Sequence, residues 1–339
     1  MDNLFISFLY SKHFLFAFTT TLLLSTVFIG YILKSKIFSR FIDIPNHRSL
    51  HIKPKSKIGG LAIIISIIIS ILLYNFQFIY LIPFLLVLLF LSFLDDLIVI
   101  KPSIRLAVQF LTTFIFLTIL NLQLSYLLLI TFLFVLVWII NLYNFMDGSD
   151  GLATGMSIIG FSFYAIISIL AGEVDFAILN TIIVAGCISF LFFNYPPAKI
   201  FMGDTGSIPL GFLCGAVGII GWQKLLWPLW LPIIIFSPFI IDATTTLIKR
   251  LINKESLTQA HRSHYYQRAI LSGYSHKQIA LFSYFLMIFS GLVGLIALTT
   301  DNNKIITFMF ILLFFCFVLI MRFVDIIWAK YLVSHQNNE

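Results

Sequence analysis

Acidic and amide side chains interrupt the apolar sequence at three separate places, and each place could do chemistry. They are the pair Asp95 and Asp96, the set Asn144, Asp147 and Asp150, and Asp204 between two glycines. Such a group near hydrocarbon costs several kcal/mol unless a cation, a partner or water meets it. Adjacent carboxylates also repel each other unless a divalent metal or a shared proton relieves them. These residues predict a metal or phosphate site, although a plain helix cap would also explain Asp150 or Asp204 taken alone.

Basic residues that could hold phosphate lie close to two of the apolar runs. Lys53, Lys55 and Lys57 stand just before two glycines, where a helix N-terminus and ammonium groups could bind a phosphate together. Arg105, near the start of another run, could hold an anion opposite the paired aspartates. A basic segment lying against anionic lipid headgroups is an equally good interpretation of the three lysines.

Two histidines lie in the longest basic segment, near residue 260. His261 and His264 share one face if this segment is helical, and they would then present a hydrogen-bonding surface in one direction. A zinc site is the weaker interpretation, because no cysteine or third nearby histidine completes it. Asp242, in the preceding apolar run, is expected either to support a metal site or to pair with Lys249 or Arg250.

Eleven apolar runs must position these groups. The runs lie near residues 14–33, 59–74, 78–94, 104–120, 124–142, 151–171, 176–193, 207–222, 226–248, 278–300 and 305–328. The chain is 60% hydrophobic and 10% charged, which excludes a soluble globular domain. It predicts an all-α polytopic membrane protein of about 10–11 transmembrane helices, formed as a single domain over residues 1–339. The ninth run contains three prolines and is expected to be kinked or broken.

The distribution of lysine and arginine predicts the orientation. Basic residues follow the first run rather than precede it, so we expect a retained helix with its N-terminus outside. When the runs alternate from there, only Lys12, Lys224 and Lys304 of the 21 lysines and arginines fall outside. The net charge of +7 is thus explained by the cytoplasmic loops and does not call for nucleic acid. All the acidic motifs fall at cytoplasmic helix ends, so the active-site loops are predicted to be cytoplasmic.

The motifs, taken in order, resemble the polyprenyl-phosphate N-acetylhexosamine-1-phosphate transferase superfamily, glycosyltransferase family 4. They are the Asp95-Asp96 pair, Asn144-Phe-Met-Asp147-Gly-Ser-Asp150-Gly, Phe201-Met-Gly-Asp204-Thr-Gly-Ser207 and the histidine segment. The resemblance covers about residues 44–275. It implies a multi-pass enzyme of the bacterial inner membrane that moves a sugar 1-phosphate from a UDP-sugar to a polyprenyl phosphate, releases UMP and needs Mg²⁺, with Mn²⁺ as a substitute. A homodimer is compatible with the resemblance.

The resemblance also implies a role for each matching residue. The catalytic residues would be Asp95, Asp96, Asp204, His261 and His264. The substrate-binding residues would be Asn144, Asp147, Asp150, Arg105, Lys57, Asn194 and Arg262. The metal ligands would be Asp204, Asn144 and Asp95.

Two departures from the family pattern bear on the substrate. The segment His261-Arg-Ser-His264 stands where the enzyme of peptidoglycan synthesis has three consecutive histidines, which argues against a muramoyl-pentapeptide substrate. It resembles instead the branch that begins O-antigen or capsule units from N-acetylglucosamine, N-acetylfucosamine or N-acetylquinovosamine. The run Pro54-Lys-Ser-Lys-Ile-Gly-Gly also differs from the family pattern, which weakens phosphate contacts assigned to that loop.

The alternatives are the pentapeptide transferase itself and, from another class, a transporter of polyprenyl lipids or sugar nucleotides. Transporters place their binding groups near the membrane midplane between repeated halves. Here the polar groups gather at one predicted face, and the sequence shows no internal repeat. This pattern favours the enzyme.

Overall fold

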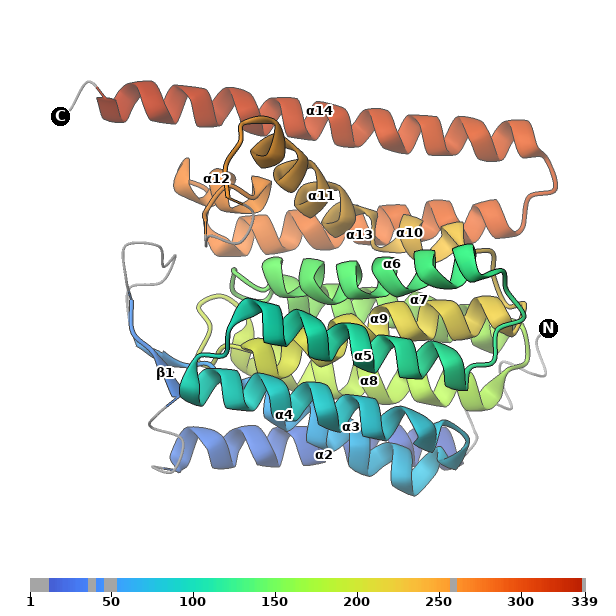
Figure 1. Cartoon of the computed structure of the whole chain (residues 1–339). Helices are drawn as coiled ribbons and strands as arrows, with labels where there is room; N and C mark the ends of the chain where they lie inside the picture. The colour runs from blue at the N-terminus through green and yellow to red at the C-terminus, as the bar shows by residue number, and fades with distance from the viewer. Residues whose placement is uncertain (1–11, 36–40, 46–53, 257–260, 337–339) are drawn as a thin grey trace.

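The computed structural model describes residues 12–35, 41–45, 54–256 and 261–336, and nearly all of this part is helical (Figure 1). The predicted phosphate contact of Lys53 lies outside the described residues. The elements are α2 (Lys12–Lys34), β1 (Ile42–Asp43), β2 (Lys55–Ser56), α3 (Gly59–Tyr74), η2 (Phe76–Leu81), α4 (Ile82–Ile98), α5 (Pro102–Ile119), α6 (Tyr126–Phe145), α7 (Leu152–Leu170), α8 (Val174–Asn194), α9 (Asp204–Gln223), α10 (Trp230–Ile235), α11 (Ser237–Ile252), α12 (Tyr265–Leu271), α13 (His276–Leu298) and α14 (Asn303–Gln336).

Each predicted apolar run forms a helix or a broken helix. Within the described residues, nine helices have the length and hydropathy needed to cross a membrane, and α3 is a shorter apolar helix of 16 residues. The ninth run is broken at Phe236 into α10 and α11, because prolines cannot continue a helix without losing backbone hydrogen bonds. The structure confirms an all-α polytopic membrane protein.

The helices form one bundle in which α9 is the most enclosed of the long helices (Figure 1). In the figure α2 lies along one side of the bundle and α14 along the opposite side, where α14 packs only loosely on α12 and α13. Close packing at the centre needs glycine: a Cβ on Gly60 of α3 would lie 2.1 Å from the backbone nitrogen of Gly206 of α9. This contact brings the N-termini of α3 and α9 side by side.

The five connections that carry the sequence motifs gather at one end of the bundle, with the small β1–β2 hairpin and the end of α14 (Figure 1). In the hairpin Ile42 pairs with Ser56, and Asp43 pairs with Lys55. α2 begins at the other end. The structure therefore confirms that the motifs share one face, and the charge distribution predicts that this face is cytoplasmic.

Several helices, α6 and α9 among them, extend further than the sequence predicted. α6 continues to Phe145, so Asn144 lies in its last turn rather than in a loop. α9 begins at Asp204, so this carboxylate is on the first residue of the helix. A negative side chain is favoured there because the first turn of a helix presents unpaired N–H groups.

Candidate active site at one end of the helical bundle

The first and fourth motif loops are joined backbone to backbone. The N–H of Phe201 donates to the carbonyl of Ser56 at 2.8 Å, and the N–H of Gly59 donates to the carbonyl of Phe201 at 2.9 Å. Gly203 has a φ of +65°, and a Cβ built on it would lie 1.9 Å from the carbonyl oxygen of Lys57. Only glycine allows this approach, which places Lys57 beside the start of α9.

Three carboxylates and two cations form an ion-pair cluster at this point, which we call the charged cluster: Asp95, Asp96, Asp204, Arg105 and Lys57. Nζ of Lys57 lies 2.6 Å from Oδ1 of Asp96. Nη1 of Arg105 lies 2.6 Å from Oδ2 of Asp95 and 3.5 Å from Oδ2 of Asp204. The charged cluster thus joins the last turn of α4, the first turn of α5, the loop before α3 and the first residue of α9.

The charged cluster has one more carboxylate than it has cations, and one carboxylate oxygen, Oδ2 of Asp96, has no hydrogen-bond partner among the described residues. Burial lowers the pKa of Lys57, but its hydrogen bond to Asp96 and the charge of that carboxylate outweigh burial, so the pKa of Lys57 is raised and the ammonium is kept charged. Oδ2 of Asp96 is buried and has no hydrogen-bond partner among the described residues. A buried carboxylate oxygen without a partner is costly, so it is suited to receive a ligand.

The third motif adjoins the charged cluster through α9 and its preceding loop. The hydroxyl of Ser207 donates to Oδ1 of Asn144 at 2.8 Å. The N–H of Gly203 donates to the carboxylate of Asp147. Burial, followed by the charges of Asp204 and Asp150, raises the pKa of Asp147 well above its usual value. Asn144 and Asp147 therefore border the same space as Asp204.

Asp147→Asn is expected to stabilise the chain, increasingly so at higher pH. Because the native pKa of Asp147 is raised, its contribution to the free energy of unfolding is complete below the unfolded-state pKa of about 4 and is lost as pH rises through the native pKa. The midpoint of thermal unfolding of the variant in detergent should exceed that of the parent by more at about pH 8 than at about pH 5. Asp301→Asn, at an exposed position at the other end, is the control. A difference that does not vary with pH would contradict this account.

Asp150 and Asn194 lie near the charged cluster, but their polar atoms are already engaged. Oδ2 of Asp150 accepts from the N–H of Ala198 at 2.9 Å and lies 3.7 Å from Nζ of Lys55. The amide of Asn194 accepts from the N–H of Gly151 at 3.0 Å and donates to a carbonyl of its own loop. Both side chains are buried. Their geometry favours holding the third and fourth loops together over contact with substrate.

The histidine segment is not helical where the sequence predicted a shared face. α12 begins only at Tyr265, and residues 261–264 precede it. Asp242 explains the helix start, because its carboxylate accepts from the N–H groups of Tyr265 and Tyr266 at 2.9 and 3.0 Å. Both expectations for Asp242 were therefore wrong: it joins neither the charged cluster nor a lysine or arginine, and instead caps α12 and contacts His264.

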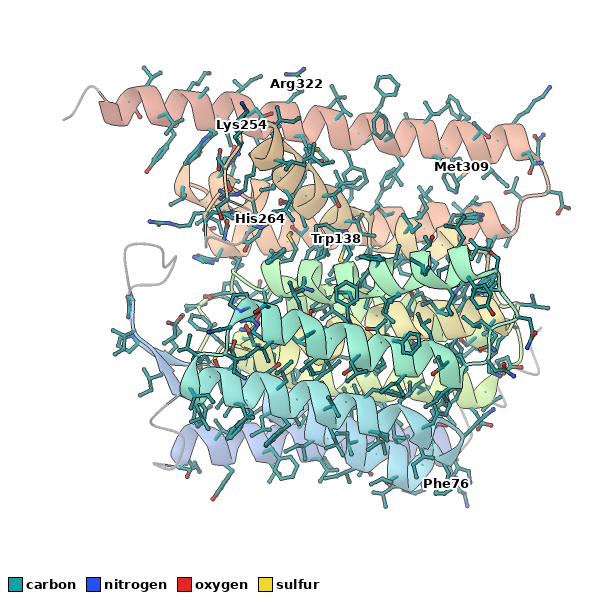
Figure 2. All side chains as sticks on the ribbon, in the orientation of Figure 1. Phe76, Trp138, Lys254, His264, Met309 and Arg322 are labelled. Carbon is teal, nitrogen blue, oxygen red and sulfur yellow. The ribbon has the colours of Figure 1, made fainter. Side chains whose placement is uncertain are left out.

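The two histidines nevertheless lie together and next to the third motif. Their ring centroids are 5.0 Å apart. The ring of His264 stacks on Phe145 at 5.9 Å, and Figure 2 shows it between α12 and the end of α6. Gly148 makes this docking possible, because a Cβ there would lie 2.1 Å from the hydroxyl of Tyr266. Arg262, in the same segment, has no ion pair or hydrogen bond with the part of the chain that the structure describes.

Three further side chains position these loops and were not predicted. The hydroxyl of Tyr266 donates to the carbonyl of Phe145 at 3.0 Å, and that of Tyr284 donates to the carbonyl of Gly151 at 2.6 Å. Asp325 of α14 pairs with basic side chains of α11 and α12. Only Asp325 carried a signal in the sequence, as a carboxylate within an apolar run.

Oxygen ligands for a hard divalent cation are present, although they are paired with cations. Among the described residues, no three His, Cys, Asp or Glu side chains are already grouped to hold a metal ion. Arg105 instead pairs with Asp95 and Asp204. Oδ2 of Asp96 has no partner among the described residues, and Oδ1 of Asn144 accepts from Ser207 of α9. Carboxylate and amide oxygens are the ligands that Mg²⁺ prefers. The donor set therefore fits the ion once the guanidinium of Arg105 moves away from Asp95 and Asp204.

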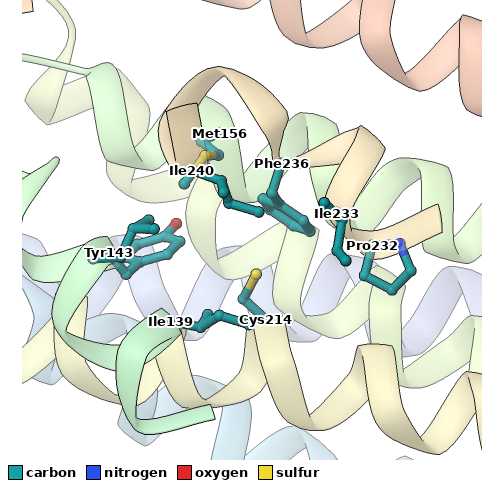
Figure 3. Close-up of a pocket in the computed structure, with 9 residues that line it drawn as sticks. Ile139, Tyr143, Met156, Cys214, Pro232, Ile233, Phe236 and Ile240 are labelled. Carbon is teal, nitrogen blue, oxygen red and sulfur yellow. The ribbon is translucent and has the colours of Figure 1, made fainter. Parts of the chain in front are cut away.

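An apolar cavity lies beside the end of α6 that carries Asn144 (Figure 3). Ile139 and Tyr143 of α6, Cys214 of α9 and Phe236 at the break between α10 and α11 are among the residues that line it. The proline-induced break in the ninth run thus forms one wall of the cavity.

Comparison with known proteins identifies the family. The model of glycosyl transferase family 4 matches residues 78–222. The chain is 31% identical over 288 residues to the probable undecaprenyl-phosphate N-acetylglucosaminyl 1-phosphate transferase of Bacillus subtilis (strain 168), an alignment that covers 79% of this chain and 80% of that protein. Phospho-N-acetylmuramoyl-pentapeptide-transferases match less of the chain. That of Desulforamulus reducens is 32% identical over 163 residues, 48% of this chain and 47% of the relative. That of Staphylococcus aureus (strain JH9) is 35% identical over 159 residues, 46% of this chain and 47% of the relative.

The matched segment contains every member of the charged cluster except Lys57. Residues 78–222 include Asp95, Asp96, Arg105, Asn144 and Asp204. Since the Bacillus subtilis relative also aligns with most of both chains, the chain belongs to glycosyl transferase family 4.

Proposed function

We propose that this protein transfers an N-acetylhexosamine 1-phosphate from a UDP-sugar to undecaprenyl phosphate, giving a polyprenyl-diphosphate sugar and UMP. The observation that carries the proposal is the charged cluster, which sets Arg105 and Lys57 among three carboxylates at one end of a membrane bundle. The Bacillus subtilis relative, named for N-acetylglucosamine, favours that sugar. In the cell this reaction would begin an O-antigen or another envelope polysaccharide at the inner membrane.

The reaction must bring two anions together. An oxygen of the lipid phosphate forms a bond to the sugar-bearing phosphorus of the UDP-sugar, and the bond from that phosphorus to the oxygen of UMP breaks. The second pKa of a phosphate monoester is about 6, so the attacking phosphate is mostly ionised at neutral pH and gains little from a general base. Electrostatic stabilisation should therefore contribute more than proton transfer.

The cations of the charged cluster can supply part of that stabilisation. Arg105 and Lys57 are held by carboxylates, and each could exchange a carboxylate oxygen for a phosphate oxygen as substrate enters. Arg262 has no such partner among the described residues and could pair with phosphate directly. Asp95 or Asp96 would position the acceptor phosphate, or deprotonate its minority species.

Mg²⁺ is the proposed cofactor, with Asp204, Asn144 and Asp95 as its holders. The unpaired Oδ2 of Asp96 supports a cation at this place. When bound, the ion would neutralise charge on the diphosphate and on the leaving UMP. Asp147 borders the same space, next to Gly203, and would contact the nucleotide.

The apolar cavity has a volume of only about 30 Å³, and it is the proposed place where the walls would open to admit the polyprenyl chain. It adjoins the turn of α6 that ends at Asn144, so a lipid lying there would have its phosphate near the charged cluster. The break between α10 and α11 forms one wall, and a broken helix can adjust its packing more readily than a continuous one.

A panel of UDP-sugars tests the proposal and its rivals. We expect the purified protein, given one polyprenyl phosphate and Mg²⁺, to release UMP from a UDP-N-acetylhexosamine but not from UDP-N-acetylmuramoyl-pentapeptide. Release from the pentapeptide substrate alone would establish the peptidoglycan alternative. No release from any UDP-sugar would favour a transporter.

A further inference from the structure

The ring of His261 is held on one side by a single residue, Ser263. The hydroxyl oxygen of Ser263 lies 2.7 Å from Nδ1 of His261, and the backbone N–H of Ser263 points at the same nitrogen at 3.4 Å. A backbone N–H can only donate, so Nδ1 must offer its lone pair. A neutral His261 then carries its proton on Nε2.

Arg250 fixes the direction in which the Ser263 hydroxyl donates. Nη1 of Arg250 donates to the Ser263 oxygen at 3.4 Å, which leaves the hydroxyl hydrogen for His261. Arg250 is buried and cannot turn away easily. It pairs with Glu255 at 2.8 Å and donates to the carbonyl of Ser256 at 2.6 Å. The chain of donors from Arg250 through Ser263 to His261 therefore has one polarity.

The surroundings also keep His261 neutral. Burial, followed by the electrostatic effects of the neighbouring His264 and Arg250, lowers the pKa of His261 to about 4. Nε2 of His261 has no hydrogen-bond partner in the described segments of the chain. Its ring lies beside His264, which stacks on the end of α6 next to Asn144. A fixed N–H donor is thus available next to the proposed substrate site.

We propose that Ser263 is a positioning residue that holds His261 in its Nε2–H form, so that His261 donates a hydrogen bond to an acceptor oxygen of the bound sugar nucleotide. The inference rests on the proposed function for the identity of that ligand. It assigns His261 to recognition rather than to removal of a proton. A diphosphate oxygen and the acetamido carbonyl of the sugar are both acceptors, and the ligand series below separates them.

Nitrogen NMR of isotope-labelled histidine tests the donor form directly and needs no activity. The His261 signal is identified by its loss in His261→Gln. In the unsubstituted protein at neutral pH, we expect the shifts of a protonated Nε2 and an unprotonated Nδ1. Ser263→Ala removes the 2.7 Å contact from the hydroxyl and leaves only the 3.4 Å contact from the backbone N–H, so part of the population should move its proton to Nδ1. Ser263→Thr, which keeps the hydroxyl, should restore the original pattern. Ser272→Ala is the matched control, because the buried Ser272 hydroxyl has no partner among the described residues. A protonated Nδ1 in the unsubstituted protein would overturn the proposal.

Substitution of the ring separates a donor from a base. Glutamine keeps an N–H donor but cannot take up a proton, whereas phenylalanine keeps only the ring shape. We expect His261→Phe to weaken binding of UDP-N-acetylglucosamine about tenfold, and His261→Gln to stay closer to the parent. Equal loss of kcat in both variants with unchanged binding would assign His261 as a base and overturn the proposal.

The choice of ligand locates the acceptor oxygen. If the His261→Phe loss appears with UDP-N-acetylglucosamine but not with UDP-glucose or UDP, the acceptor is the acetamido carbonyl. If it appears with all three, the acceptor is a diphosphate oxygen. If the unsubstituted protein binds no uridine nucleotide, the proposed function fails, while the NMR result still decides the state of His261.

Discussion

Asp204→Asn is expected to abolish turnover while leaving the chain folded. Asp204 is the first residue of α9, its carboxylate lies 3.5 Å from Arg105, and it is a proposed holder of Mg²⁺. Removing its charge should cost several kcal/mol of transition-state stabilisation, which corresponds to about 10³-fold in rate. Asparagine has nearly the same shape, so the midpoint of thermal unfolding should change little. The measurement is UMP release alongside a thermal unfolding curve in detergent.

The control removes a shorter ion pair at the far end of the bundle. Glu173 pairs with Lys224 at 2.6 Å in the connections opposite the motifs. Glu173→Gln should therefore leave UMP release within about twofold of the parent, because a half-exposed ion pair contributes about 1 kcal/mol or less. If Asp204→Asn retained activity at ordinary Mg²⁺, Asp204 would have to be removed from the proposed site.

Gly203→Ala is expected to have the next largest effect after Asp204→Asn, and it should lower both the stability of the fold and the rate of UMP release. Gly203 has a positive φ that side chains rarely adopt, at a cost of about 1–3 kcal/mol. Its new Cβ would also meet the Lys57 carbonyl at 1.9 Å, so the backbone of the first loop must move. That movement would draw Lys57 away from Asp96. We expect a fall of about 100-fold or more in UMP release, together with a lower unfolding midpoint.

Gly172→Ala is the control that separates the collision of a new Cβ with the backbone from the strain of a positive φ. Gly172 also has a positive φ, of 80°, but a Cβ there would meet nothing within 4 Å, and it lies in a connection at the other end of the bundle. It should lower the unfolding midpoint slightly and leave the rate unchanged. Equal losses of activity in the two variants would show that the approach of Gly203 to Lys57 does not matter for function.

The helices and the shared face of the motifs could be predicted because each depends on local sequence. Apolar runs of spanning length and the positions of lysine and arginine require no knowledge of packing. Even the break at Phe236 followed from prolines in the same run. The residues Asp95, Asp96 and Asp204 could be selected because a carboxylate near hydrocarbon needs a partner, and the structure gives two of them Arg105.

Pairings between distant segments could not be predicted. Nothing local to Lys57 indicates that it meets Asp96, since this contact depends on the backbone pairing of residues 56–60 with 201–202. Asp150 looks like a substrate ligand by residue type, yet it holds the loop at Ala198. The helical face predicted for the histidines was wrong because Asp242, more than twenty residues earlier, determines where α12 starts.

The most direct test of the central claim is UMP release from UDP-N-acetylglucosamine by the purified protein, with polyprenyl phosphate and Mg²⁺ each present or omitted. The account predicts UMP and an equal amount of lipid-linked sugar phosphate only when both are present. UMP released without lipid, at one equivalent per enzyme, would contradict direct attack by the lipid phosphate. No UMP from any UDP-N-acetylhexosamine under the complete conditions would contradict the transferase function itself.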